Sequence, residues 1–199
     1  DAQRKFIADA AHQLRTPLAG LRTQTELALR QEDAEEVHRT LRQIDTATAR
    51  TTHMVNQLLS LARAEPGANR LYAPQPLDLG TLARLTTTEW VPRAIERNID
   101  LGFESKAGTT MIEGDAILLK ELLGNLLDNA IRYTPASGQI TVKWHHNSEF
   151  ATFSVEDTGP GIASEHFARL SERFYRIDRS RSRDTGGTGL GLAIVKHVI

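Results

Sequence analysis

The amino-acid sequence predicts an α + α/β protein: an antiparallel helical hairpin that forms a dimeric four-helix bundle, followed by an α/β sandwich domain. Three observations predict this organisation. Residues 1–64 contain one proline and one glycine, and their apolar side chains recur every three or four residues, as they do along a helix. Residues 65–76 hold three prolines and one glycine, which favours an interdomain linker. From residue 77 to residue 199, helical patterns alternate with the two-residue period of strands.

The composition limits the classes of function that the chain can have. Its 24 lysines and arginines nearly balance 25 aspartates and glutamates, so no global field draws it to nucleic acid or to anionic lipid. We therefore expect no nucleic-acid partner and no membrane contact by this part of the chain. The lack of cysteine excludes disulfides and thiolate metal sites. No apolar run approaches the roughly 20 residues that cross a bilayer, and Asp1 opens directly into a helical pattern, as in a piece of a longer protein.

Residues 1–64 are expected to form two helices with a break at 31–33. The first helix carries an apolar series at Phe6, Ala10, Leu14, Leu18, Leu21 and Ala28. The second carries a heptad-like seam at Val37, Leu41, Ile44, Thr48, Thr51, Val55, Leu58 and Ala62. Each helix can bury only one stripe, so two helices cannot enclose a core. A homodimer that joins two hairpins into a four-helix bundle resolves this.

The second domain, from residue 77 to residue 199, mixes helices and strands. Helices are expected at 78–97 and 115–133, single strands at 99–103 and 110–112, and a hairpin that pairs 140–145 with 150–155. The hairpin turn contains Asn147 and Ser148, which favour turns. These elements predict an antiparallel or mixed sheet with helices on one face.

His12 is the first candidate for chemistry. It lies two residues, about 200° around the helix, from Leu14 on the expected buried face, so its ring should point outward. Pro17 lacks a backbone donor and should bend the helix just after the histidine. Imidazole is largely neutral near neutral pH and can then act as a nucleophile. An exposed helical histidine is nevertheless more often an ordinary surface residue. The neighbouring residues decide between this interpretation and a reactive histidine.

Polar residues follow one stripe of the helix expected at 115–133. Glu121, Asn125, Asn129 and Arg132 are spaced at i, i+4, i+8 and i+11, which places them on one face. Amide oxygens suit Mg²⁺ and a guanidinium suits phosphate. A solvated helix face is the alternative interpretation of this spacing.

Two glycine-rich segments favour a nucleotide. Asp157 to Ile162 follows a strand, and Asp157 can accept a hydrogen bond from an exocyclic amine such as that of adenine. The second segment, 186–192, precedes a helical pattern, where backbone N–H groups and the helix dipole favour phosphate. Neither segment is a P-loop, which needs Lys-Ser or Lys-Thr after its last glycine.

The stretch AHQLRTPLAGL, residues 11–21, resembles the phosphoacceptor motif of bacterial sensor histidine kinases. The resemblance implies that His12 is phosphorylated and that Thr16 positions water for dephosphorylating the partner protein. The longer stretch from Phe6 to Arg30 is most similar to sensors of the tricarboxylate-transport type. Most relatives carry Glu or Asp after the histidine, whereas this chain has Gln13, whose amide cannot accept the ring proton as a base. Gln13 can still orient the ring.

NLLDNAIRY, DTGPGI, RFYRID and GGTGLGLAIV, in this order, resemble the ATP-binding domain that histidine kinases share with type II topoisomerases, mismatch-repair ATPases and a heat-shock chaperone. By this resemblance, ATP and Mg²⁺ are the cofactors, Asn129 is the main magnesium ligand, helped by Asn125, and Arg132 lies near the phosphates. The implied adenine contacts are Tyr133, Asp157, Gly159, Gly161 and Ile162. The implied triphosphate contacts are Gly187, Thr188, Gly189, Leu190, Gly191 and Leu192.

The same resemblance makes residues 163–185 a mobile lid. Phe174 would anchor this lid, and either Arg176 or Arg179 would reach the phosphates. A solvated role is an equally good interpretation for each arginine, because five arginines follow one another closely from Arg173 onward.

The function implied is Mg-ATP-dependent autophosphorylation of His12, transfer to an aspartate of a response regulator receiver domain, and phosphatase activity on that regulator. Topoisomerase and chaperone ATPases carry a water-activating glutamate where this chain has Asn125, which favours a kinase over an ATPase. A stand-alone ATPase and a non-catalytic nucleotide-binding scaffold are the alternatives. We expect a location on the cytoplasmic side of the bacterial inner membrane. Relatives continue beyond the second glycine segment, so the chain is expected to be truncated at Ile199.

Overall fold

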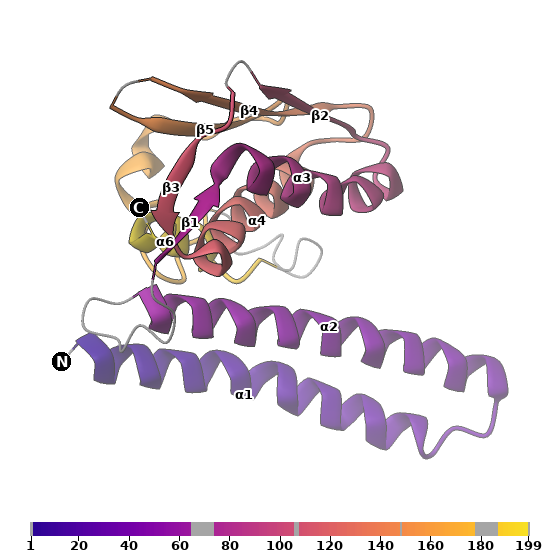
Figure 1. Ribbon diagram of the computed structural model, residues 1–199. Helices are drawn as coiled ribbons and strands as arrows, with labels where there is room; N and C mark the ends of the chain where they lie inside the picture. The colour runs from indigo at the N-terminus through magenta and orange to yellow at the C-terminus, as the bar shows by residue number, and fades with distance from the viewer. Residues whose placement is uncertain (1, 65–73, 106–107, 148, 178–186, 199) are drawn as a thin grey trace. The chain divides into compact units, whose positions relative to one another are not determined.

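The computed structural model describes residues 2–64, 74–105, 108–147, 149–177 and 187–198 (Figure 1). The chain divides into two compact units, Asp1–Leu59 and Ser60–Ile199. We refer to them as the helical unit and the α/β unit. In the described part of the chain, no helix combines the length and the apolar character that crossing a membrane requires.

The helical unit confirms the predicted hairpin. Helix α1 (Ala2–Ala28) runs without interruption through Pro17, and helix α2 (Ala34–Ala64) follows after the predicted break. The Asp33 side chain fixes the start of α2, because its Oδ1 accepts from the backbone N–H groups of Glu35 at 2.8 Å and Glu36 at 3.1 Å. Such a cap satisfies donors that have no partner inside the helix.

The predicted seam of α2 separates into two rows. One row, at seven-residue intervals, is buried or half-buried: Val37, Ile44, Thr51 and Leu58. In the other row, Val55 is half-buried, but Leu41, Thr48 and Ala62 are exposed. In the single chain this seam is therefore only partly covered, and its burial in a four-helix bundle of two hairpins stays a prediction. The physical reason is that the other helix of one hairpin can cover only one side of α2.

The described residues of the α/β unit form two sheets. Its elements are β1 (Gln75–Asp78), α3 (Leu79–Glu96), β2 (Asp100–Ser105), β3 (Met111–Gly114), α4 (Ala116–Tyr133), β4 (Gln139–His146), β5 (Ala151–Asp157), η1 (Ser164–Arg169) and α6 (Gly191–Val198). The larger sheet has the order β2-β4-β5, with β2 parallel and β5 antiparallel to β4. Strands β1 and β3 form a separate antiparallel pair. Figure 1 shows α3 and α4 on one face of the larger sheet. The predicted mixed sheet with helices on one face is confirmed.

Strand β1 is an element that the sequence analysis misses, and it begins within the range expected to be linker. Pro76 lies inside it, opposite Glu113 of β3. Among the described residues β1 pairs with β3 alone, and proline is tolerated in such an edge strand where its nitrogen faces away from the partner. The strand expected at 110–112 runs instead from Met111 to Gly114. Most of the predicted linker, residues 65–73, lies outside the described residues.

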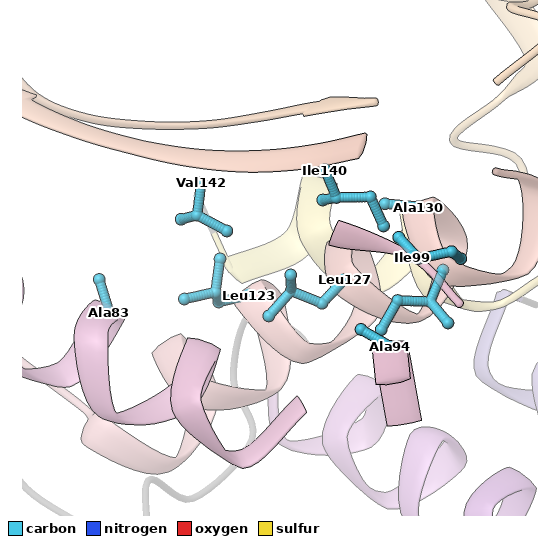
Figure 2. Close-up of a cluster of buried hydrophobic side chains, with 9 residues drawn as sticks. Ala83, Ala94, Ile99, Leu123, Leu127, Ala130, Ile140 and Val142 are labelled. Carbon is cyan, nitrogen blue, oxygen red and sulfur yellow. The ribbon is translucent and has the colours of Figure 1, made fainter. Parts of the chain in front are cut away.

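The core of the α/β unit lies between the larger sheet and the two helices (Figure 2). Strand β4 alternates as predicted: Ile140, Val142 and Trp144 are buried, and Trp144 packs on Phe153 of β5 with ring centroids 4.8 Å apart. The buried members of the cluster are Ala83, Ala94, Ile99, Leu123, Leu127, Ala130, Ile131, Ile140 and Val142. One face of α4 is thus fixed under the sheet.

We predict that Leu127→Ala lowers the free energy of unfolding of the α/β unit by about 2–5 kcal/mol, because truncating a fully buried leucine leaves a cavity. Tryptophan fluorescence in urea measures this unit, since both tryptophans, Trp90 and Trp144, belong to it. Leu85→Ala is the control: Leu85 is 51% exposed, and its loss should change the free energy by about 0.5 kcal/mol or less. Equal effects of the two changes would contradict the assigned core.

Candidate functional site

Helix α4 carries the central part of the candidate site. Asp115 caps its start, accepting from the backbone N–H groups of Ile117 at 2.8 Å and Leu118 at 3.2 Å. The apolar face of α4 is held under the sheet by the core described above. The polar residues of the predicted stripe are therefore fixed on the remaining faces of the helix.

The two candidate magnesium ligands have different environments. Asn125 is only 3% exposed, and its Nδ2 donates to the Glu121 carbonyl at 2.8 Å. Its Oδ1 lies 3.1 Å from the position that a Cβ on Gly191 would take, so it faces the start of α6. Asn129, one turn later, is half-buried, and its amide forms no hydrogen bond with the described residues. The solvated-face interpretation is wrong for Asn125, because α6 packs against α4 there.

Arg132 lies against the second glycine segment. Its Nη1 is 2.9 Å from the position of a Cβ on Gly187, so only glycine fits there without displacing the guanidinium. Its Nη2 forms an ion pair with Asp128 at 2.5 Å. Asp128, which was not predicted from the sequence, is 5% exposed and also pairs with Arg93 of α3 at 3.0 Å. The sequence signal that could have identified Asp128 is its place on the apolar side of a helix, since a buried acid needs partners.

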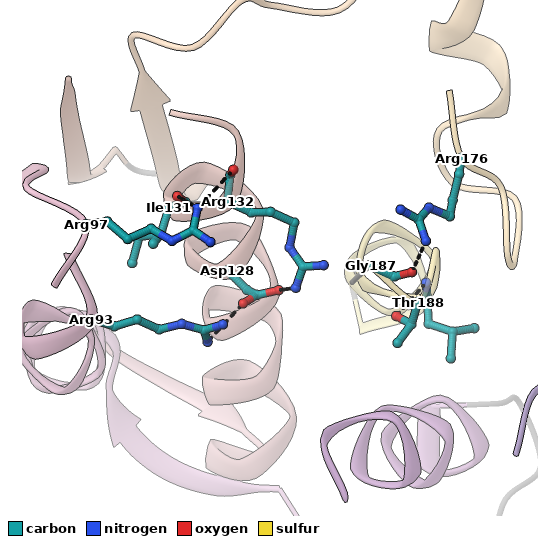
Figure 3. Close-up of polar contacts among 9 residues, drawn as sticks. Arg93, Arg97, Asp128, Ile131, Arg132, Arg176, Gly187 and Thr188 are labelled. Atoms are coloured by element: carbon teal, nitrogen blue, oxygen red, sulfur yellow. Dashed lines mark hydrogen bonds and ion pairs between the residues drawn. The ribbon is translucent and has the colours of Figure 1, made fainter. Parts of the chain in front are cut away.

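The second glycine segment is tied to the predicted lid anchor through the backbone. The Phe174 N–H donates to the Gly189 carbonyl at 2.8 Å. Both residues have positive φ, 63° for Phe174 and 70° for Gly189. A Cβ on Gly189 would lie 2.8 Å from the Phe174 carbonyl carbon, so glycine is required at this contact. The Arg176 Nη1 donates to the Gly187 carbonyl at 2.5 Å, as Figure 3 shows.

The first glycine segment lies against the end of α4. The Gly159 N–H donates to Asp157 Oδ1 at 2.8 Å. A Cβ on Gly159 would lie 3.1 Å from the Tyr133 carbonyl oxygen, and the Tyr133 side chain is 51% exposed. Gly161 has φ 72°, and Ile162 is 44% exposed. Residues from both glycine segments thus lie along α4 between Asn125 and Tyr133.

The remaining triphosphate candidates lie where the second segment enters α6. Leu190 is fully buried, and its N–H donates to the Thr188 hydroxyl at 3.3 Å. Leu192 is half-buried in the first turn of α6. The leucines therefore fasten the segment to the core, and the backbone and Thr188 are left as the groups that suit phosphate.

The predicted lid is described as far as residue 177. His166 Nδ1 is 2.8 Å from the Tyr175 hydroxyl, and the Arg169 guanidinium lies 4.2 Å from the Tyr175 ring centroid. A hydrogen bond from Arg169 to Glu172 raises the pKa of Arg169 above its ordinary value. Arg179, the other arginine candidate, lies outside the described residues.

His12 is exposed on α1, as predicted, and the neighbouring Gln13 and Thr16 are exposed too. The three leucines of the expected buried face differ in exposure. Leu14 and Leu21 are half-buried, but Leu18 is 55% exposed in the single chain. The described part of the chain contains no group of three or more His, Cys, Asp or Glu that could hold a metal ion.

Two family models match this chain. The His Kinase A (phospho-acceptor) domain matches residues 2–67, and the histidine kinase-, DNA gyrase B- and HSP90-like ATPase matches residues 114–199. The sensor protein kinase PmrB of Pseudomonas aeruginosa is 39% identical over 199 residues, which are 100% of this chain and 41% of that protein. The chain thus spans less than half the length of this relative.

Solved structures agree with these matches. The mycobacterial sensor histidine kinase MprB is 30% identical, with a TM-score of 0.52, over 63% of this chain and 77% of that chain. Full-length ShkA in complex with AMPPNP is 28% identical, with a TM-score of 0.64, over 98% of this chain and 40% of that chain.

We predict that Gly189→Ala destabilises the α/β unit more than Gly161→Ala does. Both glycines have positive φ, which costs an alanine about 1–2 kcal/mol. A Cβ on Gly161 would meet no atom within 4 Å, whereas one on Gly189 would overlap the Phe174 backbone, which adds about 1–3 kcal/mol. Tryptophan fluorescence during urea unfolding compares the two variants. Equal losses would mean that the Phe174 contact does not constrain the segment.

Proposed function

The chain belongs to the sensor histidine kinases of two-component systems, and from this premise we propose that it transfers the γ-phosphoryl group of Mg-ATP to His12. One observation carries the proposal. Residues of both glycine segments and the amides and guanidinium of α4 come together in the α/β unit of a chain whose helical unit displays an exposed histidine. The identity of the family confirms the resemblance inferred from the motifs. The tricarboxylate-transport subtype stays a prediction.

ATP is the nucleotide that these residues fit. Asp157 has one carboxylate oxygen engaged by Gly159 and can accept from the adenine amine with the other. The backbone of Gly187 to Gly191 and the N-terminal end of α6 suit the phosphates. The complex of ShkA with AMPPNP, which resembles ATP but carries an imido bridge, supports this assignment by similarity.

The amide oxygens of Asn129 and Asn125 fit Mg²⁺, a hard cation that binds one or two protein oxygens together with phosphate oxygens. Asn129 has an amide without a hydrogen-bond partner among the described residues, and the Asn125 Oδ1 faces the start of α6. A bound Mg²⁺ would neutralise charge on the phosphates. The residues therefore suit the metal that the family implies.

The transfer step is a displacement at phosphorus. A ring nitrogen of neutral His12 attacks the γ-phosphorus, an N–P bond forms, the bond from the γ-phosphorus to the bridging oxygen breaks, and ADP leaves. The ring proton passes to solvent or to a phosphate oxygen, because the amide of Gln13 cannot accept it. Asn125 cannot activate water either, so ATP is held without rapid hydrolysis.

The later steps follow from the same assignment. We propose that phosphohistidine passes its phosphoryl group to an aspartate of a response regulator receiver domain. Thr16, exposed one turn after His12, would position water for dephosphorylating that regulator. The whole protein would act at the cytoplasmic side of the bacterial inner membrane.

A homodimer through the helical unit belongs to this proposal. Leu18 and Leu41, both part of the predicted apolar series, are 55% and 50% exposed in the single chain. Exposed leucines at helical spacing fit the seam of a four-helix bundle made by two hairpins.

The kinase activity predicts an acid-labile, alkali-stable label when the chain is incubated with Mg²⁺ and γ-labelled ATP. His12→Gln should abolish the label and keep ATP binding, because the histidine belongs to the helical unit and the nucleotide residues belong to the α/β unit. Asn129→Ala should abolish the label by weakening Mg-dependent ATP binding. Label that persists in His12→Gln would exclude His12 as the acceptor. Release of free phosphate without protein label would favour an ATPase. The absence of both free phosphate and protein label would favour a scaffold.

The dimer predicts that Leu41→Asp converts the chain to a monomer, because a charge at a buried bundle position has no partner. Multi-angle light scattering measures the mass at micromolar concentration. Leu85→Asp is the matched control, since Leu85 is similarly exposed but lies on α3 of the α/β unit. A parent chain that is already a folded monomer would contradict the dimer.

The residue after the histidine gives a pH-dependent prediction. If a carboxylate there assists removal of the ring proton, Gln13→Glu should raise the initial rate of His12 phosphorylation, by about 10²-fold at most. The gain should be smallest at low pH, where the carboxylate also favours the charged ring, which cannot attack. Initial rates from about pH 6 to about pH 9 test this. A rate that never exceeds the parent would assign ring orientation, not proton removal, to this position.

A further inference from the structure

Asp128 is a buried carboxylate with two arginine partners from different helices. Its side chain is 7% exposed, with Oδ1 3.0 Å from Arg93 Nη1 and Oδ2 2.5 Å from Arg132 Nη2 (Figure 3). Arg93 belongs to α3, and Arg132 belongs to α4, one turn after Asp128. The carboxylate thus connects the two helices beside Asn129.

Arg97, the C-cap residue of α3, makes further contacts with this end of α4. The Arg97 Nη1 lies 3.5 Å from the Ile131 carbonyl and 3.4 Å from the Arg132 carbonyl, in the last turn of α4. The Arg93 guanidinium also lies 5.2 Å from the centroid of the Trp90 ring. The Asp128 carboxylate is therefore fixed from both sides.

The ion pair orients the Arg132 guanidinium. An arginine side chain has several rotatable bonds and loses rotamer freedom when it is fixed. Arg132 is 11% exposed at its side chain, with Nη2 on Asp128 and Nη1 against Gly187 of the glycine segment. Because the guanidinium is planar and rigid, an ion pair that fixes Nη2 also fixes the direction of Nη1.

The charges allow this arrangement beside a triphosphate. A lone carboxylate there would repel phosphate, but Asp128 is paired with two guanidinium groups, so the three side chains together carry one positive charge. The Asp128 carboxylate can therefore orient the Arg132 guanidinium toward the phosphates, while the three side chains together still attract them.

We propose that Asp128 is a positioning residue that holds the Arg132 guanidinium against the second glycine segment, where it meets the phosphates of ATP. Asp128 acts through Arg132 and does not itself touch the nucleotide. The inference rests on the proposed function, because it takes ATP as the ligand of this site.

Equilibrium dialysis of the whole chain with labelled ATP and with labelled adenosine tests the proposal. Asp128→Asn should raise the Kd for ATP about tenfold, in line with one charge-assisted contact. The Kd for adenosine, which has no phosphate, should stay within about twofold. Asp128→Ser, smaller and still able to accept a hydrogen bond, should show the same pattern and serves if the asparagine variant does not fold. Lys120→Met is the control: it removes an exposed ion pair with Glu89 that also joins α4 to α3, and it should leave the Kd for ATP within about twofold.

A double-mutant cycle identifies the route of the effect. Asp128→Asn should add no further loss of ATP affinity in an Arg132→Met background, because the two residues act as one unit. Equal weakening of ATP and adenosine, or additive losses in the cycle, would overturn the positioning role and leave a structural one. Unchanged ATP affinity in both Asp128 variants would also overturn it. A parent chain that does not bind ATP would instead overturn the proposed function.

Discussion

The amphipathic character of α4 is the constraint on which the rest of the α/β unit depends. Leu123, Leu127 and Ile131 are buried under the larger sheet, and removing this apolar surface from water fixes the rotation of the helix about its axis. Once the rotation is fixed, the direction of each polar side chain on α4 is fixed too. Asn125, Asn129 and Arg132 are placed by a hydrophobic contact in which they take no part.

The same helix sets the positions of both glycine segments. Gly159 lies against the Tyr133 carbonyl, Gly187 against Arg132, and Gly191 against Asn125. In each case a Cβ would approach an atom of α4 at about 3 Å. The lack of side chains at these positions therefore lets segments far apart in the sequence approach one helix this closely. Close packing and ligand binding impose the same requirement on these glycines, so a glycine motif alone does not separate the two roles.

Local patterns predicted most elements, because they depend on neighbours within a few residues. The hairpin of α1 and α2, the alternation of β4 and the extent of α4 follow from periodicity. The exposed His12 follows from its offset to Leu14. Strand β1 could not be predicted in this way, because Pro76 argues against a strand unless the edge position is known. The exposure of Leu41 depends on which side of α2 is covered by α1, and tertiary packing determines that.

Asp128 and Asn125 show why the site itself was only partly predictable. Spacing placed Asn125 on an open polar stripe, but packing of α6 buries it, and its amide donates to the Glu121 carbonyl. Spacing gave Asp128 no role, although its burial is possible only because Arg93 arrives from α3, 35 residues earlier in the chain, and Arg132 from the next turn. A buried acid is stable only with such partners. Candidate binding residues can thus be found from motifs, whereas the residues proposed to orient them are defined by contacts between elements distant in the sequence.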